Sequence, residues 1–160
     1  MARGAAGGTD VIHGVDTGFL VAVEVSCHPD HAAARFVGSG LRKNGDLFAL
    51  APQVLAEFVH VVTDARRFSA PLAMPRALER AKAWWSARDV IRLAPEDRAV
   101  AWSLDALSQH QLGRKRILDT LLAGTLRSAG VFSVLTLNPD DFATFGEFTS
   151  VPLASGSGSP

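Results

Sequence analysis

The sequence lacks the features of secreted, cysteine-metal and membrane proteins. Its 160 residues contain a single cysteine, Cys27, so neither an internal disulfide nor a cysteine-based metal site can form. The first apolar run is interrupted by His13, Asp16 and Glu24 before it reaches the length of a signal sequence or a membrane span. We therefore expect a soluble, cytoplasmic protein with no membrane segment.

The sequence also lacks net charge, because sixteen Lys and Arg balance sixteen Asp and Glu. With 48% apolar and 20% charged residues, the composition is that of a globular protein and excludes a disordered chain or a coiled coil. We predict one domain over residues 10–153. Residues 1–9 and 154–160 are rich in Gly, Ala and Ser and are expected to be flexible ends, the second being a native tail or a vector remnant.

Short apolar runs alternate with longer helical patterns along the chain. Strands are predicted at residues 11–15, 47–50, 90–93 and 131–137. Helices are predicted from about residue 17, from Pro52, from Pro75, from Pro95 to about 110, from about 114 to 129, where Gly130 is a C-cap glycine, and after Asn138. This alternation predicts a parallel sheet covered on both faces, a three-layer α/β/α domain. In such sheets ligands bind beyond the carboxyl ends of the strands.

Several common functional motifs are missing. No G-x-G-x-x-G, P-loop, H-E-x-x-H or G-x-S-x-G sequence occurs, which removes support for dinucleotide, P-loop, zinc-protease and serine-hydrolase chemistry. Gly38-Ser39-Gly40 is an isolated G-x-G that we assign to a loop, and His28 and His31 flank Pro29 in a predicted turn.

One acidic residue stands out. On a helical wheel, Asp119 lies on the same face as the apolar residues three, four and seven positions later. A buried carboxylate costs several kcal/mol unless a cation, a metal or hydrogen bonds compensate it. The wheel alone leaves an ordinary ion pair and a functional site equally open.

Three other acids have ordinary explanations when each is taken alone. Asp16 follows the first predicted strand and Asp141 lies three residues after Asn138, so both suit the start of a helix, whereas Glu57 lies on a polar helix face. Together the acids indicate more, because the carboxyl ends of parallel strands meet at one edge of a sheet. Carboxylates gathered there repel unless divalent cations lie between them, and oxygen-only ligands favour magnesium or manganese.

The sequence resembles the PIN-domain ribonucleases, and especially the VapC toxins of bacterial toxin–antitoxin pairs. The resemblance rests on residues 15–23 (VDTGFLVAV), 28–37 (HPDHAAARFV), 51–68 (APQVLAEFVHVVTDARRF), 117–131 (ILDTLLAGTLRSAGV) and 135–145 (LTLNPDDFATF). The sequence departs from the family pattern at Gly18, where Asn is frequent, at His60, where Arg is frequent, and at Gly124, where Ala is usual.

The resemblance implies a PIN-like fold and an endoribonuclease that cleaves single-stranded or loop RNA with metal-activated water, leaving 5′-phosphate and 3′-hydroxyl ends. It implies one or two Mg²⁺ ions, with Mn²⁺ as an alternative, held by Asp16, Glu57, Asp119 and Asp141. Thr136 and Asn138 are expected to support these ligands by hydrogen bonds, and Asn138 also to cap the last helix. A cognate antitoxin and a homodimer are implied as partners.

An RNA partner is compatible with the charge. Without the four acids, sixteen basic residues face twelve acidic ones, a charge of +4. Arg114, Lys115 and Arg116 are candidate phosphate contacts, or simply a solvated helix end. Two alternatives stay open: a PIN-like module that binds RNA or protein without cleavage, supported by Gly18, and another metal-dependent phosphohydrolase. A haloacid-dehalogenase-type phosphatase would need a second Asp at the position of Gly18.

Overall fold

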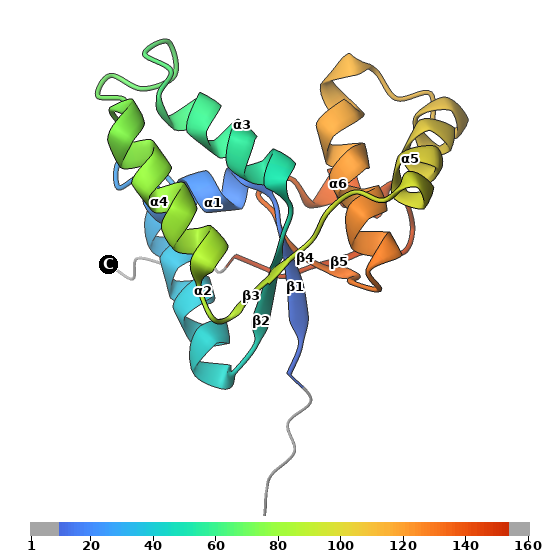
Figure 1. Ribbon diagram of the computed structural model, residues 1–160, viewed down its shortest axis with the longest axis horizontal. Helices are drawn as coiled ribbons and strands as arrows, with labels where there is room; N and C mark the ends of the chain where they lie inside the picture. The colour runs from blue at the N-terminus through green and yellow to red at the C-terminus, as the bar shows by residue number, and fades with distance from the viewer. Residues whose placement is uncertain (1–9, 154–160) are drawn as a thin grey trace, which may run out of the picture.

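A five-stranded parallel sheet forms the centre of residues 10–153, the part of the chain that the computed structural model describes (Figure 1). Its strand order is β3-β2-β1-β4-β5. The strands are β1 (Ile12–Val15), β2 (Leu47–Leu50), β3 (Val90–Arg92), β4 (Ser133–Leu135) and β5 (Thr149–Ser150). In register, Gly14 of β1 pairs with Ala49 on one side and with Val134 on the other, so β1 lies at the middle of the sheet.

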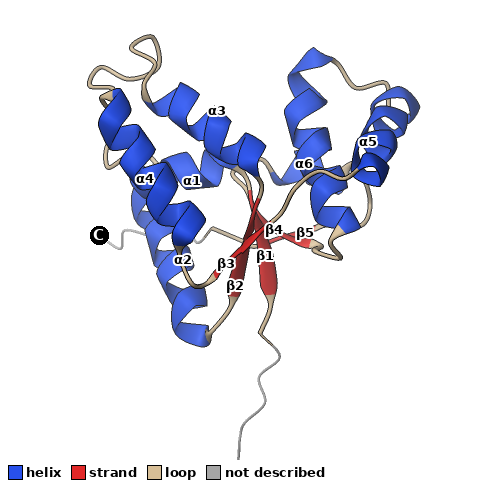
Figure 2. Ribbon diagram, viewed as in Figure 1, coloured by secondary structure: helices blue, strands red, loops and turns tan. Residues whose placement is uncertain are grey.

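Helices cover both faces of this sheet, as Figures 1 and 2 show. One layer contains α1 (Thr17–Glu24), α2 (His31–Asn44), α3 (Pro52–Val62) and α4 (Met74–Ser86). The opposite layer contains α5 (Asp97–Gln109) and α6 (Ile117–Ser128). A 3₁₀ turn, η1 (Arg114–Arg116), precedes α6, and α7 (Pro139–Ala143) connects β4 to β5.

The connections reverse direction at β1. From β1 the chain moves through β2 to β3 on one side, and it then returns by α5 and α6 to place β4 on the other side of β1. Right-handed crossovers require these two sets of helices to lie on opposite faces. The point between the carboxyl ends of β1 and β4 is therefore the topological switch point, where open α/β sheets bind ligands.

The core lies between the sheet and both helical layers. Phe48 of β2, Phe19 of α1 and Leu126 of α6 are completely buried there, because helices cover both faces of the sheet. Local signals end and begin the helices around this core. Pro52 starts α3, and Gly130 adopts a positive φ of 72° just after α6, a conformation that glycine adopts without the steric cost of a side chain.

The predicted α/β/α architecture with a parallel central sheet is confirmed, and several details are corrected. The prediction of a loop at Gly38-Ser39-Gly40 is wrong, because these residues lie within α2, whose packing against α1 outweighs the glycines' weak helix preference. The last long strand is shorter than residues 131–137, the helix expected from Pro95 begins at Asp97, and β5 was not predicted.

No helix within residues 10–153 has both the length and the apolar character needed to cross a lipid bilayer. The ends predicted to be flexible, residues 1–9 and 154–160, lie outside the described residues.

Candidate active site

A cleft of about 800 Å³ opens at the carboxyl edge of the sheet, beside the switch point. Figure 1 shows α3 and α6 on the two sides of this edge. The cleft is lined by three of the four predicted acids, Asp16, Glu57 and Asp119, and by Asn138. The other lining residues include Arg67, Arg114, Lys115 and His28, and an apolar part of the wall formed by Val21, Val61, Phe68 and Leu118.

Asp16 is fixed where β1 ends and α1 begins. Its backbone N–H donates to the Leu135 carbonyl of β4 at 3.0 Å, which extends the strand pairing to the switch point. Its carboxylate accepts hydrogen bonds from the Thr17 N–H at 2.8 Å and from the Thr136 hydroxyl at 2.7 Å. Only 7% of Asp16 is exposed. Burial raises the pKa of Asp16, and the two hydrogen bonds oppose the rise only in part.

Glu57 projects from α3 toward the same place. The Thr17 hydroxyl donates to the Glu57 carboxylate at 2.8 Å, so one residue contacts Asp16 through its backbone and Glu57 through its side chain. The α3 periodicity indicated a surface acid, but the side chain is only partly exposed because α1 packs against α3. Thr17 was missed in the sequence analysis, although its position directly after Asp16 at a helix start was the available signal.

Asp119 and Asp141 lie in the first turns of α6 and α7, and Arg116 connects them. The Arg116 guanidinium lies 3.9 Å from an Asp119 carboxylate oxygen and 3.4 Å from one of Asp141. It also donates to the Asp141 backbone carbonyl. Asp119 is half-buried, in keeping with its place on the apolar face.

The four acids share one electrostatic field. Burial raises the pKa of Asp119 to about 7, and the charges of Asp16, Asp141 and Glu57 add to the rise, whereas Arg116 opposes it. The charges of Glu57 and Asp141 likewise raise the pKa of Asp16. Repulsion of this kind requires carboxylates that are close together in a poorly solvated place. The structure therefore brings Asp16, Glu57 and Asp119 to one cleft, and Arg116 connects Asp141 to Asp119.

The remaining predicted residues have distinct positions. Thr136 contacts Asp16 directly and accepts a hydrogen bond from the Asn138 backbone N–H at 3.0 Å. Asn138 stands at the N-cap of α7, but the expectation that its side chain caps the helix is wrong, since that side chain makes no capping hydrogen bond. Of the three basic residues, Arg114 and Lys115 line the cleft, whereas Arg116 turns inward to the acids.

The chemistry of the acids suits a divalent cation, although their arrangement is open. The candidate ligands are carboxylates without Cys or His, the donor set that magnesium and manganese prefer. Within residues 10–153, however, no group of three or more His, Cys, Asp or Glu side chains is gathered closely enough to hold a metal ion. The carboxylates are thus near enough to affect one another electrostatically, but they do not form a preformed coordination sphere. Arg116 provides the positive charge beside Asp119 and Asp141.

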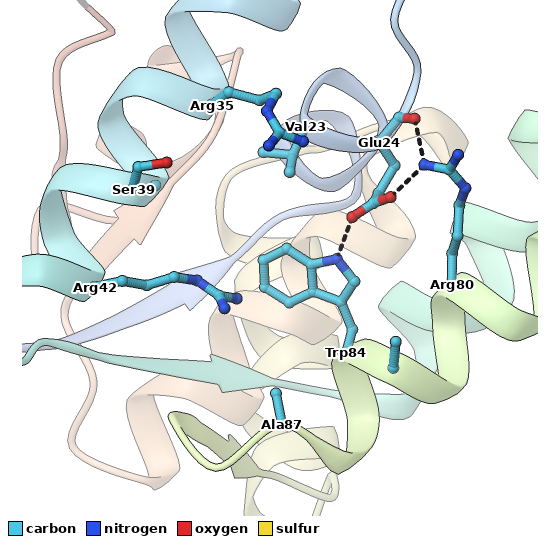
Figure 3. A pocket seen from close by; sticks show the side chains of 10 residues that line it. Val23, Glu24, Arg35, Ser39, Arg42, Arg80, Trp84 and Ala87 are labelled. Carbon is cyan, nitrogen blue, oxygen red and sulfur yellow. Dashed lines mark hydrogen bonds and ion pairs between the residues drawn. The ribbon is translucent and has the colours of Figure 1, made fainter.

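A second cleft, of about 340 Å³, lies between α1, α2 and α4. Figure 3 shows the Glu24 carboxylate between Trp84 and Arg80, with the Arg42 guanidinium beside the Trp84 ring. Trp84 Nε1 donates to Glu24 at 2.7 Å and Arg80 donates at 2.6 Å, while Arg42 pairs with Asp89 at 3.3 Å. The polar groups of this second cleft thus bind one another. The hydrogen bonds of Glu24 to Arg80 and Trp84 connect α1 to α4. Trp84 is buried.

Comparison with known proteins identifies the fold. No protein-family model matches the sequence, and no curated protein is significantly similar to it. The structure is similar to that of VapC20 from Mycobacterium tuberculosis, described as a toxin that cleaves the sarcin-ricin loop, with a TM-score of 0.69, 19% identity, and coverage of 88% of this chain and 98% of that one. It is also similar to VapBC2 from Rickettsia felis bound to a promoter DNA fragment, with a TM-score of 0.62, 18% identity, and the same coverage of 88% and 98%. The predicted PIN-like fold is confirmed.

Proposed function

We propose that this protein is a magnesium-dependent endoribonuclease that cleaves single-stranded or loop RNA. One observation carries the proposal: Asp16, Glu57 and Asp119 come from separate elements and line one cleft, and the charges of Glu57 and Asp141 raise the pKa values of Asp16 and Asp119. Four neighbouring carboxylates do not stabilise the packing of a fold, because they repel one another. A site that holds a divalent cation and a phosphodiester accounts for them.

The chain's own groups position this chemistry. Asp16 is held by Thr136 and the Thr17 N–H, and Glu57 is held by the Thr17 hydroxyl, so two candidate ligands have defined orientations before any ligand binds. A divalent cation bound by the four acids would lower the pKa of a bound water and offset charge on the phosphate. Arg114 and Lys115 line the same cleft, and their positive charges would attract the phosphates of a bound RNA.

The proposed biological setting is a cytoplasmic toxin–antitoxin pair of the VapBC type. The fold likeness to a sarcin-ricin loop cleaving toxin and to a VapBC complex supports this proposal. The partners proposed are therefore RNA as substrate, a cognate antitoxin, and a second copy of the chain in a homodimer. Light scattering coupled to size-exclusion chromatography measures the mass directly, and a value of one chain across the micromolar range would contradict the homodimer.

Cleavage of defined RNAs tests the proposal. The substrates are a sarcin-ricin stem-loop, an unrelated stem-loop and a base-paired duplex. We expect cuts in a loop that stop with chelator, return with Mg²⁺, and leave 5′-phosphate ends. Asp16→Asn should abolish cleavage while the protein stays folded. Asp140→Asn removes the same charge from an exposed neighbour of Asp141 and should stay active. Equal rates for Asp16→Asn and wild type would refute the function.

The second candidate is a PIN-like module that binds RNA or protein without cleaving RNA. It is favoured by the absence, within the described part of the chain, of three metal-binding side chains gathered in one place. Calorimetry separates the two functions. The nuclease should bind Mg²⁺ or Mn²⁺, and Asp119→Ala should weaken that binding, whereas a binding module should take up no metal that depends on Asp119.

A further inference from the structure

The side chain of Arg116 is more buried than those of its basic neighbours, Arg114 and Lys115. Arg114 and Lys115 are exposed on the rim of the cleft, but only 21% of the Arg116 side chain is exposed. Its guanidinium reaches Asp141 at 3.4 Å and Asp119 at 3.9 Å. The Nε of Arg116 is buried and has no hydrogen-bond partner within residues 10–153, so the side-chain hydrogen bond of Arg116 there is the one from Nη2 to the Asp141 backbone carbonyl.

We propose that Arg116 is a resident cation of the carboxylate site, which a divalent metal ion must displace from Asp119 and Asp141. The inference rests on the proposed function, since it concerns two of the proposed metal ligands. The proposal explains why the four acids affect one another electrostatically although no three of them within residues 10–153 are gathered around one point. Asp119 and Asp141 are each attracted to Arg116 instead. An arginine stays protonated under all physiological conditions, so its charge competes with the metal at every pH.

The contacts of Arg116 suit a replaceable cation better than a permanent one. A stable arginine–carboxylate pair is usually bidentate, with two short parallel N–H···O bonds. Here the guanidinium nitrogens lie 3.4 Å from an Asp141 carboxylate oxygen and 3.9 Å from one of Asp119. Within residues 10–153, neither contact has the geometry of a hydrogen bond. The firm bond of Arg116 is the one to the Asp141 backbone carbonyl, which is independent of the carboxylates. The guanidinium can therefore turn away from the carboxylates while its Nη2 keeps the bond to the Asp141 carbonyl of α7.

Metal affinity without RNA tests the inference. Mn²⁺ is titrated by calorimetry into wild type, Arg116→Gln, Arg116→Lys and Arg114→Gln. Arg114→Gln is the matched control, because it removes the same charge from the same 3₁₀ turn, whereas the ion pairs to Asp119 and Asp141 within residues 10–153 are made by Arg116. Removal of a competing cation should tighten Mn²⁺ binding by about tenfold in Arg116→Gln. We expect a smaller gain in Arg116→Lys and a change below about threefold in Arg114→Gln.

Thermal unfolding gives a second readout that needs no activity. In chelator, Arg116→Gln should melt below wild type, because the carboxylates lose their counter-charge. Saturating Mn²⁺ should raise its melting temperature by more than it raises that of wild type, as tighter binding requires. If Arg116→Gln does not fold, Arg116→Lys replaces it in the test, because lysine retains the positive charge. Mn²⁺ binding by Arg116→Lys that is tighter than in wild type, by less than tenfold, then supports the inference.

The outcomes separate this inference from the proposed function. Tighter Mn²⁺ binding in Arg116→Gln than in Arg114→Gln supports displacement. If wild type binds Mn²⁺ and Arg116→Gln binds it equally or more weakly, Arg116 positions the ligands and displacement is overturned, while the metal site stands. If neither wild type nor any variant binds Mn²⁺ or Mg²⁺, the proposed metal-dependent function itself fails, and displacement fails with it.

Discussion

Asp119→Asn should stabilise the metal-free protein at neutral and alkaline pH. In the folded chain the pKa of Asp119 is raised from 3.8 to about 7, chiefly by burial. Between these two values the unfolded chain loses the proton and the folded chain keeps it, so each rise in pH favours unfolding. Above about 7 the folded chain ionises as well, and the loss of stability levels off. Asn carries no charge in either state and escapes this loss.

The magnitude follows from the size of the pKa change. A rise from 3.8 to about 7 corresponds to about 4 kcal/mol at most. Because 25% of the side chain is exposed and Arg116 lies 3.9 Å away, solvent and counter-charge reduce the expected gain to about 2 kcal/mol. The difference in free energy of unfolding between variant and wild type should be near zero at pH 4 and greatest above pH ~7.

Urea denaturation in chelator, from pH 4.5 to pH 8, measures this difference. Asp105→Asn is the control, because Asp105 is exposed on α5, away from the acids, and its substitution should leave the pH dependence unchanged. The same Asp119→Asn protein should lose metal binding, so it gains stability as it loses the proposed function. A gap between Asp119→Asn and wild type that stays constant over the pH range would refute the ionisation argument.

Two further substitutions test the packing behind the site. Gly124→Ala places a methyl group 2.7 Å from the Ala99 carbonyl and against the Ser103 hydroxyl. We expect it to lower the free energy of unfolding by about 2 kcal/mol, as measured in urea, and a more stable variant would show that α5 and α6 can separate freely. Thr136→Val removes the hydroxyl that donates to Asp16. It should cost about 2 kcal/mol at pH 8 and raise the Mg²⁺ concentration needed for cleavage, and an unchanged Mg²⁺ requirement would contradict the positioning role of Thr136.

The sequence predicted the parts of the fold that depend on local patterns. Alternating apolar strands and helices led to the parallel sheet, and glycine and proline located helix ends such as Gly130 and Pro52. The α2 helix was missed around Gly38–Gly40 because glycine has a weak helix preference in isolation. There, contact between α1 and α2 outweighs that preference, and such a contact between elements leaves no local trace in the sequence.

The candidate site was predictable to different degrees. Asp119 was identifiable because a carboxylate on an apolar face breaks the helical pattern. Glu57 was identified only by the family resemblance, because helix periodicity places its side chain on the polar face. Its partner Thr17 comes from another helix, α1. The inward turn of Arg116 was hidden within a run of basic residues. Its position three residues before Asp119 was a usable signal, because residues at that spacing are neighbours on a helix.

Asp16 shows why a capping role and a functional role need not compete. As N-cap of α1 it uses one carboxylate oxygen to accept the Thr17 N–H, and the other accepts the Thr136 hydroxyl. These bonds fix the rotamer of a carboxylate that is 7% exposed, and each oxygen retains a second lone pair. An aspartate at the switch point is thus oriented by the same bonds that start the helix. Capping supplies the preorganisation that a ligand-binding carboxylate requires.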